Sequence, residues 1–240
     1  ADSDPSIGIC FSKILMLDEP EIINSAGGEC DIWGFPRDRG FLEYDKGQYD
    51  RVEEVFEGCG ASMLIKCEVI KDVGMFDSRF FMYDEDTDLA WRARLYGYKV
   101  VYVPSSVVYH KFGGTGGATN PQRRYLAVRN MLRSILKNAG TCLLLEMLSR
   151  FFIIKTAGII LFLITGRIKV SIGLLKAILW NVNYLPETLS ERKKIQGLRK
   201  VPDRKVKNLL VKRSLEMEMF KQGYLSKFKP DFRVKFWGKD

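Results

Sequence analysis

Four acidic residues stand within five positions of the stretch FFMYDEDTDLAWR, and this group has the clearest potential for chemistry in the sequence. They are Asp84, Glu85, Asp86 and Asp88, and an aromatic cluster directly precedes them. Like charges this close repel one another unless a helix terminus, a cation or a substrate offsets them. The spacing is therefore open to a structural explanation and to several functional ones.

The structural explanation is the start of a helix. Asp84 can act as the N-cap, and the next two acids then lie in the first turn, where the helix macrodipole favours anions. Asp88 and Arg92 stand four residues apart on one helix face and can form an ion pair. Gly97 ends the predicted helix.

Three functional explanations compete with this one. An EF-hand calcium loop is disfavoured, because Leu89 stands where that loop requires glycine. Asp84-x-Asp86 and Asp86-x-Asp88 each spell a DxD, a pattern that can hold a divalent metal against a nucleotide diphosphate. A carboxylate at a helix start can also act as a general base toward a bound hydroxyl.

His110 is the single histidine of the chain, and it ends a β-branched run just before Gly113 and Gly114. Glycines at such a place let a ligand approach the backbone closely. An isolated histidine is most often a surface or core residue. This one could instead be one ligand of a metal completed by carboxylates and phosphate oxygens.

The elements that must position these residues alternate between strands and helices. Strands are predicted at residues 6–17 and within residues 52–65, with a long Gly-rich functional loop at residues 24–49 between them. A short helix is predicted to end at Gly74. Two β-branched runs, separated by Pro104, follow the acidic helix.

From Pro121 onward the pattern is helical throughout. The first helix, RYLAVRNMLRSILKN, is amphipathic, with apolar Leu126, Met131, Leu132, Ile135 and Leu136. Charged residues interrupt the apolar segment that follows. Helices lying in the membrane interface are therefore favoured over a spanning or re-entrant pair and over buried bundle helices.

The distribution of charge along the chain indicates which partners the protein could bind. Residues 150–240 hold 21 Lys and Arg against 7 Asp and Glu, whereas the remainder holds 17 against 22. A basic region beside apolar helices suits an anionic membrane surface, and a solvated helix face is the simpler alternative. Few aromatic residues interleave with the basic ones, which disfavours nucleic acid as a partner.

The cysteine content bears on the cellular compartment. Five cysteines without a CxxC pair predict reduced, mostly buried thiols in a cytosolic setting, without a zinc site.

An ordered set of motifs gives the sequence a family resemblance. They are G-x-G-A-x-x-L-I, V-G-x-F-D, F-F-x-Y-x-E-D-x-D-L-x-x-R, G-Y, V-x-V-P and V-x-H-x-x-G. Together they resemble the C-terminal half of the catalytic domain of family-2 glycosyltransferases, especially the rhamnosyltransferase-like branch. The resemblance covers about residues 6–138, and Arg129-Asn130 and ERKKIQ also look like this branch.

The resemblance implies an α/β fold of the GT-A type, partial because the nucleotide-binding first half is absent. A mixed sheet is expected to precede an all-helical C-terminal region. Residues 1–118 would form the acceptor-side half of the catalytic domain, and residues 119–240 a helical, basic, membrane-associated region. The reaction implied is an inverting transfer from a nucleotide-sugar donor to a glycan or lipid-linked acceptor, dependent on Mg²⁺ or Mn²⁺.

Residue roles follow from the same resemblance. Asp86 would be the general base, Glu85 would orient the acceptor, and His110 would help bind the metal. The implied substrate-binding positions are Gly58, Gly60 and Ala61 on the acceptor side, Asp84 beside the base, and Gly113 and Gly114 over the donor phosphates.

The family's first half, with its metal-binding DxD, would precede the point where this chain starts. We therefore expect a segment of a longer enzyme of cell-surface polysaccharide synthesis, held at the cytoplasmic face of the cell membrane. The alternative is a non-catalytic membrane-binding or interaction module that retains these motifs as relics.

Overall fold

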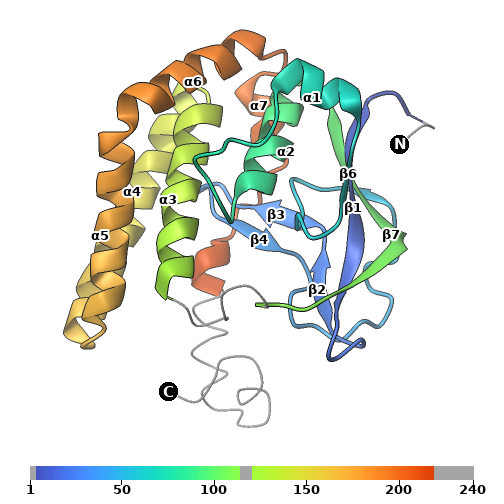
Figure 1. The fold of residues 1–240 in the computed structure, drawn as a ribbon, viewed down its shortest axis with the longest axis horizontal. Coiled ribbons are helices and arrows are strands. Elements are labelled where there is room, and N and C mark those ends of the chain that lie inside the picture. Colours follow the sequence, from blue (N-terminus) through green and yellow to red (C-terminus); the bar gives the residue numbers. More distant parts are fainter. Residues whose placement is uncertain (1–3, 114–120, 219–240) are drawn as a thin grey trace.

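The computed structural model describes residues 4–113 and 121–218, and it confirms a mixed sheet followed by a helical region (Figure 1). Strand β1 (Ile7–Met16) lies inside the sheet and is parallel to β7 (Lys99–His110). Strands β2 (Ile23–Ala26) and β6 (Met63–Ile65) pair with β1 antiparallel. The short β5 (Glu53–Glu54) extends the sheet beyond β7.

The expectation of one long loop at residues 24–49 is wrong in part. Strand β2 and the hairpin of β3 (Gly28–Cys30) and β4 (Pro36–Asp38) lie within it. These strands have only three or four residues; β2 pairs with the preceding strand β1, and β3 pairs with β4. Strands this short have too few residues for an alternating pattern to mark them, and glycines among them give the stretch the appearance of a loop.

The predicted division at Pro104 is also wrong, because β7 continues through it as a single strand. Its register against β1 shifts where Ser12 faces Val103 and Lys13 faces Val107. The intervening residues form an irregularity in the ladder. Proline has no N–H to donate and is tolerated at such a place.

The helices of the first half end where the sequence predicts. Helix α1 (Cys67–Val73) ends at Gly74, with a φ of 82°, and α2 (Glu85–Tyr96) ends at Gly97, with a φ of 117°. Both values lie in the region that favours glycine. Helix α2 lies between the sheet and the helical region, because Ala90 packs in the sheet-side core while Trp91 packs among the helices.

Residues 121–218 are mostly helical, as predicted, and pack directly on α2 (Figure 1), whereas residues 219–240 lie outside the described residues. Its members are α3 (Pro121–Asn138), α4 (Thr141–Ile164), α5 (Ile168–Asn183), α6 (Leu185–Leu198) and α7 (Asp203–Lys207). Trp91 and Leu95 of α2 share one hydrophobic core with Met131 and Ile135 of α3 and Phe151 of α4. The division at residue 118 stays a prediction.

Helix α4 is, within the described ranges, the one helix long and apolar enough to cross a membrane. Its first half packs inward through Leu143, Met147 and Phe151, whereas Ile160 and Ile164 near its end are exposed. Much of the outer surface of α5 is exposed and apolar as well.

The basic segment after α5 lies against the body of the protein. Arg192 donates to the carbonyls of Leu136 and Ala139, and the backbone N–H of Lys200 donates to the carbonyl of Leu95. Leu215 is fully buried.

The expectation of mostly buried thiols is wrong. All five cysteines are free, but only Cys30 is buried, and Cys67 and Cys142 are exposed.

Candidate active site

Helix α2 begins in an unusual backbone conformation. Phe81, Tyr83 and Asp84 have φ values of 64°, 71° and 67°, in the left-handed region that non-glycine residues seldom adopt. Asp84 occupies the N-cap position, but its side chain makes no capping hydrogen bond. The capping role expected for its carboxylate is therefore wrong.

Asp86 is held at the first turn of α2 by two backbone N–H groups. Its Oδ1 accepts from the N–H of Thr87 at 2.8 Å, and its Oδ2 accepts from the N–H of Gly60 at 2.7 Å. Gly60 lies in the turn before β6, so this second bond ties the helix start to the sheet side of the molecule. The carboxylate is therefore fixed in direction.

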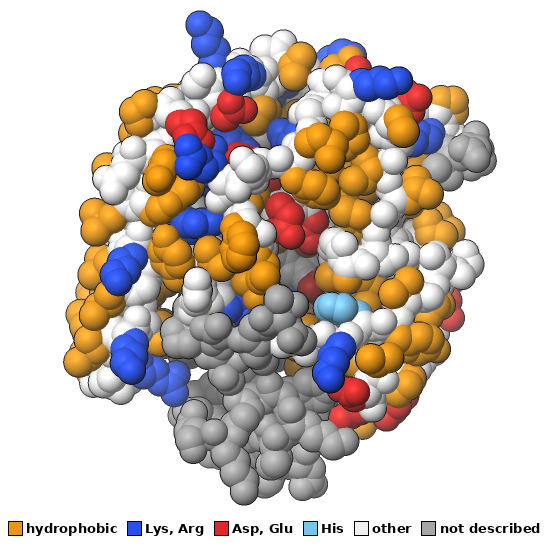
Figure 2. All heavy atoms as spheres, viewed as in Figure 1, with side chains coloured by type: hydrophobic (Ala, Val, Ile, Leu, Met, Phe, Trp, Pro, Cys, Tyr) orange, Lys and Arg blue, Asp and Glu red, His pale blue; other side chains and the backbone are white. Residues whose placement is uncertain are grey.

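A cleft of about 460 Å³ opens beside this carboxylate. It is lined by Gly60, Met63, Phe76, Asp77, Ser78, Phe81, Glu85 and Asp86. Figure 2 shows a hollow on this face, with acidic side chains at its centre and hydrophobic ones around them. An acidic centre with an apolar rim suits a ligand that has both hydroxyl groups and an apolar portion.

The acids at the start of α2 are desolvated and crowded. Burial raises the pKa of Asp86, and the N–H groups of Gly60 and Thr87 oppose this rise only in part. Burial, followed by the charges of Asp86 and Glu85, raises the pKa of Asp84 well above its usual range. Burial and the charge of Asp86 raise the pKa of Glu85. A carboxylate in such surroundings is more basic than one in water.

Two further acids, which sequence reasoning missed, belong to the same group. Glu57 is buried and accepts a hydrogen bond from the hydroxyl of Thr87 at 3.2 Å. Burial and then the charges of Asp86 and Asp38 raise its pKa well above the usual range. Glu57 could have been suspected as an acid directly before the G-x-G-A turn.

Asp38 on β4 is the second missed acid. Burial raises its pKa to about 7, the charge of Asp86 adds to the rise, and the Ser25 hydroxyl and Arg123 oppose it. No sequence signal marks Asp38, because it lies in the stretch that reads as a loop. We call Asp38, Glu57, Asp84 and Asp86 the front acids.

Asp88, only two residues beyond Asp86, has the opposite surroundings. It is fully buried and bonds Arg92 at 2.9 Å, Lys137 at 3.0 Å and Asn138 at 2.9 Å. Burial alone would raise its pKa, but the charges of Lys137 and Arg92 and the bond from Asn138 outweigh it, and the pKa is lowered. The predicted pair with Arg92 is thus present.

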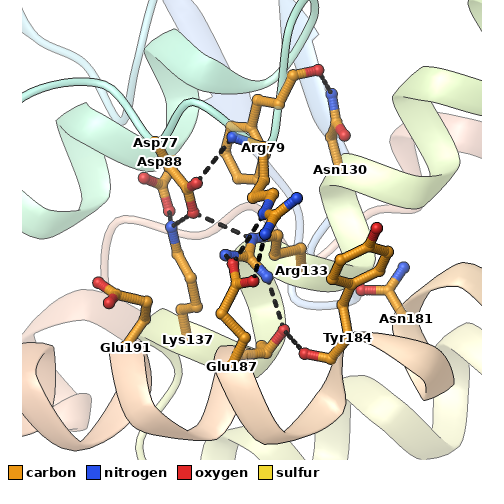
Figure 3. Close-up of polar contacts among 12 residues, drawn as sticks. Asp77, Arg79, Asp88, Asn130, Arg133, Lys137, Asn181, Tyr184, Glu187 and Glu191 are labelled. Atoms are coloured by element: carbon orange, nitrogen blue, oxygen red, sulfur yellow. Dashed lines mark hydrogen bonds and ion pairs between the residues drawn. The ribbon is translucent and has the colours of Figure 1, made fainter.

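Asp88 belongs to a network that joins α2 to α3 and α6 (Figure 3). Lys137 also bonds Asp77 at 2.7 Å, and Arg133 bonds Asp77 and Glu187, each at 2.9 Å. Arg133 and Lys137 are almost completely buried. The polar face of α3 therefore lies inside the protein, although its amphipathic pattern predicts exposure.

The predicted glycine and alanine positions lie in different surroundings. Gly60 lines the cleft, whereas Gly58 is buried, and a Cβ there would lie 2.5 Å from the ring of Phe11. Ala61 is exposed and outside the cleft lining. Gly113 lies in a turn with a φ of 74°, and Gly114 lies outside the described residues. Their substrate-binding roles stay predictions.

His110 lies at the end of β7, and its Nδ1 is 2.7 Å from Oδ1 of Asn24. An amide oxygen only accepts, so Nδ1 donates a proton to Asn24 and the ring is held by this bond. Figure 2 shows the histidine on the same face as the central acidic group. Within residues 4–113 and 121–218, no three His, Cys, Asp or Glu side chains are arranged to hold a metal. The described residues therefore do not form a metal site on their own.

Comparison with known proteins gives two results. The family model described as glycosyl transferase family group 2 matches residues 43–180. An N-acetylglucosaminyl-diphospho-decaprenol L-rhamnosyltransferase of Mycobacterium tuberculosis (strain CDC 1551 / Oshkosh) is 45% identical over 58 residues, which cover 24% of this chain and 19% of that protein. The protein of the same name from strain ATCC 25618 / H37Rv matches over the same length with the same identity. The match thus spans less than a fifth of these relatives' length.

Proposed function

Because this chain belongs to the glycosyl transferase family group 2, we propose that it provides the acceptor side of an inverting sugar transfer, with Asp86 as the general base. One observation carries this proposal: the carboxylate of Asp86 lines the cleft and is held there by the N–H of Gly60. A base at this place needs a fixed direction and raised basicity, and Asp86 has both.

In the proposed reaction, a hydroxyl of the acceptor lies within hydrogen-bonding distance of Asp86. The carboxylate accepts the hydroxyl proton as the oxygen attacks the anomeric carbon of the donor sugar. The nucleotide diphosphate leaves from the opposite face of the sugar, so the configuration inverts. Glu85, which also lines the cleft, orients the acceptor.

We propose a lipid-linked acceptor, because the M. tuberculosis relatives are named for a decaprenol-linked one. The donor would be a nucleotide sugar, and rhamnose is the sugar that the same name suggests. Met63, Phe76 and Phe81 supply apolar surface beside the acids of the cleft. Such a rim suits an acceptor whose sugar is joined to a lipid.

The test is a transfer assay on the full-length protein with a nucleotide-sugar donor and a lipid-linked acceptor. We expect transfer with inversion, measured by NMR of the anomeric proton. Asp86→Asn is expected to lower kcat by about 10²–10⁴-fold, the usual contribution of a general base, while donor binding survives. Normal transfer by Asp86→Asn would exclude this residue as the base.

We also propose that the chain lies at the cytoplasmic face of the cell membrane, with the outer face of α5 against the bilayer. Its exposed apolar residues are Ile168, Ile172, Leu175, Leu179 and Val182, and Lys169 and Lys176 are exposed beside them. Apolar and basic side chains together favour an anionic bilayer surface.

Flotation with anionic liposomes at low and high salt tests this placement. The double variant I172E/L179E is expected to lose binding, because two charges would enter the bilayer surface. Val52→Glu is the matched control, since Val52 is an exposed apolar residue before β5, outside the helical region. Equal flotation of both variants would contradict the placement.

The expected divalent metal has a separate test. Because the described residues supply His110 but no surrounding ligand cluster, we derive no step of the reaction through a metal. If His110 does bind Mg²⁺ or Mn²⁺, His110→Ala should raise the metal concentration needed for half-maximal transfer. An unchanged titration would remove His110 from any metal site.

A further inference from the structure

The loop between Phe80 and Asp84 sets the direction in which α2 begins. Three of its residues have left-handed backbone conformations, and none of them is glycine. Such conformations persist only where the surrounding structure enforces them. Something outside the loop must therefore hold it, and the structure locates the contacts on α3.

Asn130 of α3 holds the loop through its side-chain amide. Its Nδ2 donates to the carbonyls of Phe80 at 3.1 Å, Met82 at 2.8 Å and Tyr83 at 2.7 Å. Asn130 is fully buried. One amide group thus contacts three carbonyl groups of the irregular backbone, immediately before the acids of α2.

Arg129 reinforces these contacts from the preceding position. Its Nη2 donates to the carbonyls of Arg79 at 2.9 Å and Phe80 at 2.7 Å. Its Nε donates to Oδ1 of Asn130 at 2.8 Å, which directs the Nδ2 of that amide toward the loop. The guanidinium also lies over the ring of Trp180 on α5, 4.6 Å from its centre.

We propose that Asn130 and Arg129 are positioning residues for the sugar-transfer site: they fix the loop at residues 80–84, and through it the direction of Glu85 and Asp86 in the cleft. This inference rests on the proposed function of Asp86. Neither side chain lines the cleft, so both act through the loop backbone. Figure 3 shows Asn130 projecting from α3 at one end of the buried network.

The test compares Asn130→Ala with a matched control, Asn138→Ala, in the full-length protein. Asn138 is also a fully buried asparagine of α3, but it bonds Asp88 and not the loop. We expect Asn130→Ala to lower kcat by about 100-fold, as a misplaced reacting group does, with the donor KM nearly unchanged. Asn138→Ala is expected to lose stability but to keep most of its kcat.

Two further measurements cover the case in which Asn130→Ala folds poorly. Arg129→Lys keeps the positive charge and should therefore fold. Because it lacks the planar guanidinium, its kcat should still fall, but less than that of Arg129→Ala. Amide hydrogen exchange should increase at residues 80–88 in the Asn130 and Arg129 variants but not in Asn138→Ala.

The outcomes are distinguishable. A wild-type protein without transfer activity would overturn the proposed function itself. An active wild type, together with equal kcat values for Asn130→Ala and Asn138→Ala, would overturn only the positioning role. Exchange at residues 80–88 that is the same in all variants would also overturn it.

Discussion

Asp86 and Asp88 stand two residues apart on the same helix, yet the structure gives them opposite properties. Asp86 lies in the cleft beside other carboxyl groups, accepts hydrogen bonds from the N–H groups of Gly60 and Thr87, and has a raised pKa. Asp88 is bonded to two cations and an amide inside the protein, and its pKa is lowered.

The two acids of this motif differ because they lie on different sides of the helix. Residues two apart on a helix point to different sides of it. The side that carries Asp86 faces the cleft and the front acids, and the side that carries Asp88 faces Arg92 and α3. A buried pair like that of Asp88 holds the fold, whereas a crowded, incompletely compensated acid like Asp86 has the raised pKa that the proposed base requires.

The largest expected difference between the two acids is in their effect on stability when each is neutralised in turn. Asp88→Asn should lower the free energy of unfolding by about 3 kcal/mol, because it leaves buried cations without part of their compensation. Asp86→Asn should leave stability unchanged or raise it, because it removes a desolvated charge from a group of acids. Urea denaturation near pH 7 measures both. Equal losses of unfolding free energy in the two variants would contradict the different roles inferred for the two acids.

The glycines of the G-x-G-A turn offer a second contrast. Gly58→Ala should cost about 1–3 kcal/mol of stability, because its Cβ would lie 2.5 Å from the ring of Phe11 in a packed core. Gly60→Ala should mainly lower kcat, because its Cβ would lie 3.1 Å from Oδ2 of Asp86 and displace that carboxylate. Thermal unfolding and transfer assays on both variants check this assignment.

The pH dependence of stability should differ in sign between the two acids. The pKa of Asp88 is lowered by folding, so its contribution is present above the ordinary value of 3.8 and disappears as the pH falls further. The pKa of Asp86 is raised, so its charge reduces stability as the pH rises above 3.8. Unfolding curves of both Asn variants against wild type, from pH 3 to pH 8, measure these trends.

Asp38, a neighbour of Asp86 in the group of front acids, gives a further test. Its pKa is about 7, so Asp38→Asn should match wild type in stability below pH 3.8 and exceed it increasingly up to about pH 7. Asp38 is still protonated while Asp86 ionises, so its removal should leave the acid limb of the activity profile unchanged. A limb that moves to lower pH would show that Asp38 is already charged when Asp86 ionises, and would contradict this order of ionisation.

Local features of the fold could be predicted from the sequence because neighbouring residues create them. Gly74 and Gly97 end helices where their positive φ angles are needed. Arg92 reaches Asp88 because four residues bring them onto one face of α2. The Asp86 position followed from the ordered motifs, although its role awaits the test above.

Other features depended on contacts that local pattern does not encode. Asp84 would be a standard N-cap, but it has a left-handed backbone in the loop held by Asn130, and its carboxyl makes no capping bond. The strands between residues 23 and 38 have only three or four residues each, too few for an alternating pattern to mark them.

The sequence by itself determined a cluster of acids at the start of a helix, the glycine-rich turn before it and the helices that follow, because these depend on residues close together in the chain. Only the tertiary structure decided which acids face the cleft and which are neutralised. Asp38 and Glu57 reach Asp86 from other elements, and Lys137 reaches Asp88 from α3. Charge interactions act through space over a few ångströms, so the packing of distant segments sets the character of each carboxyl group.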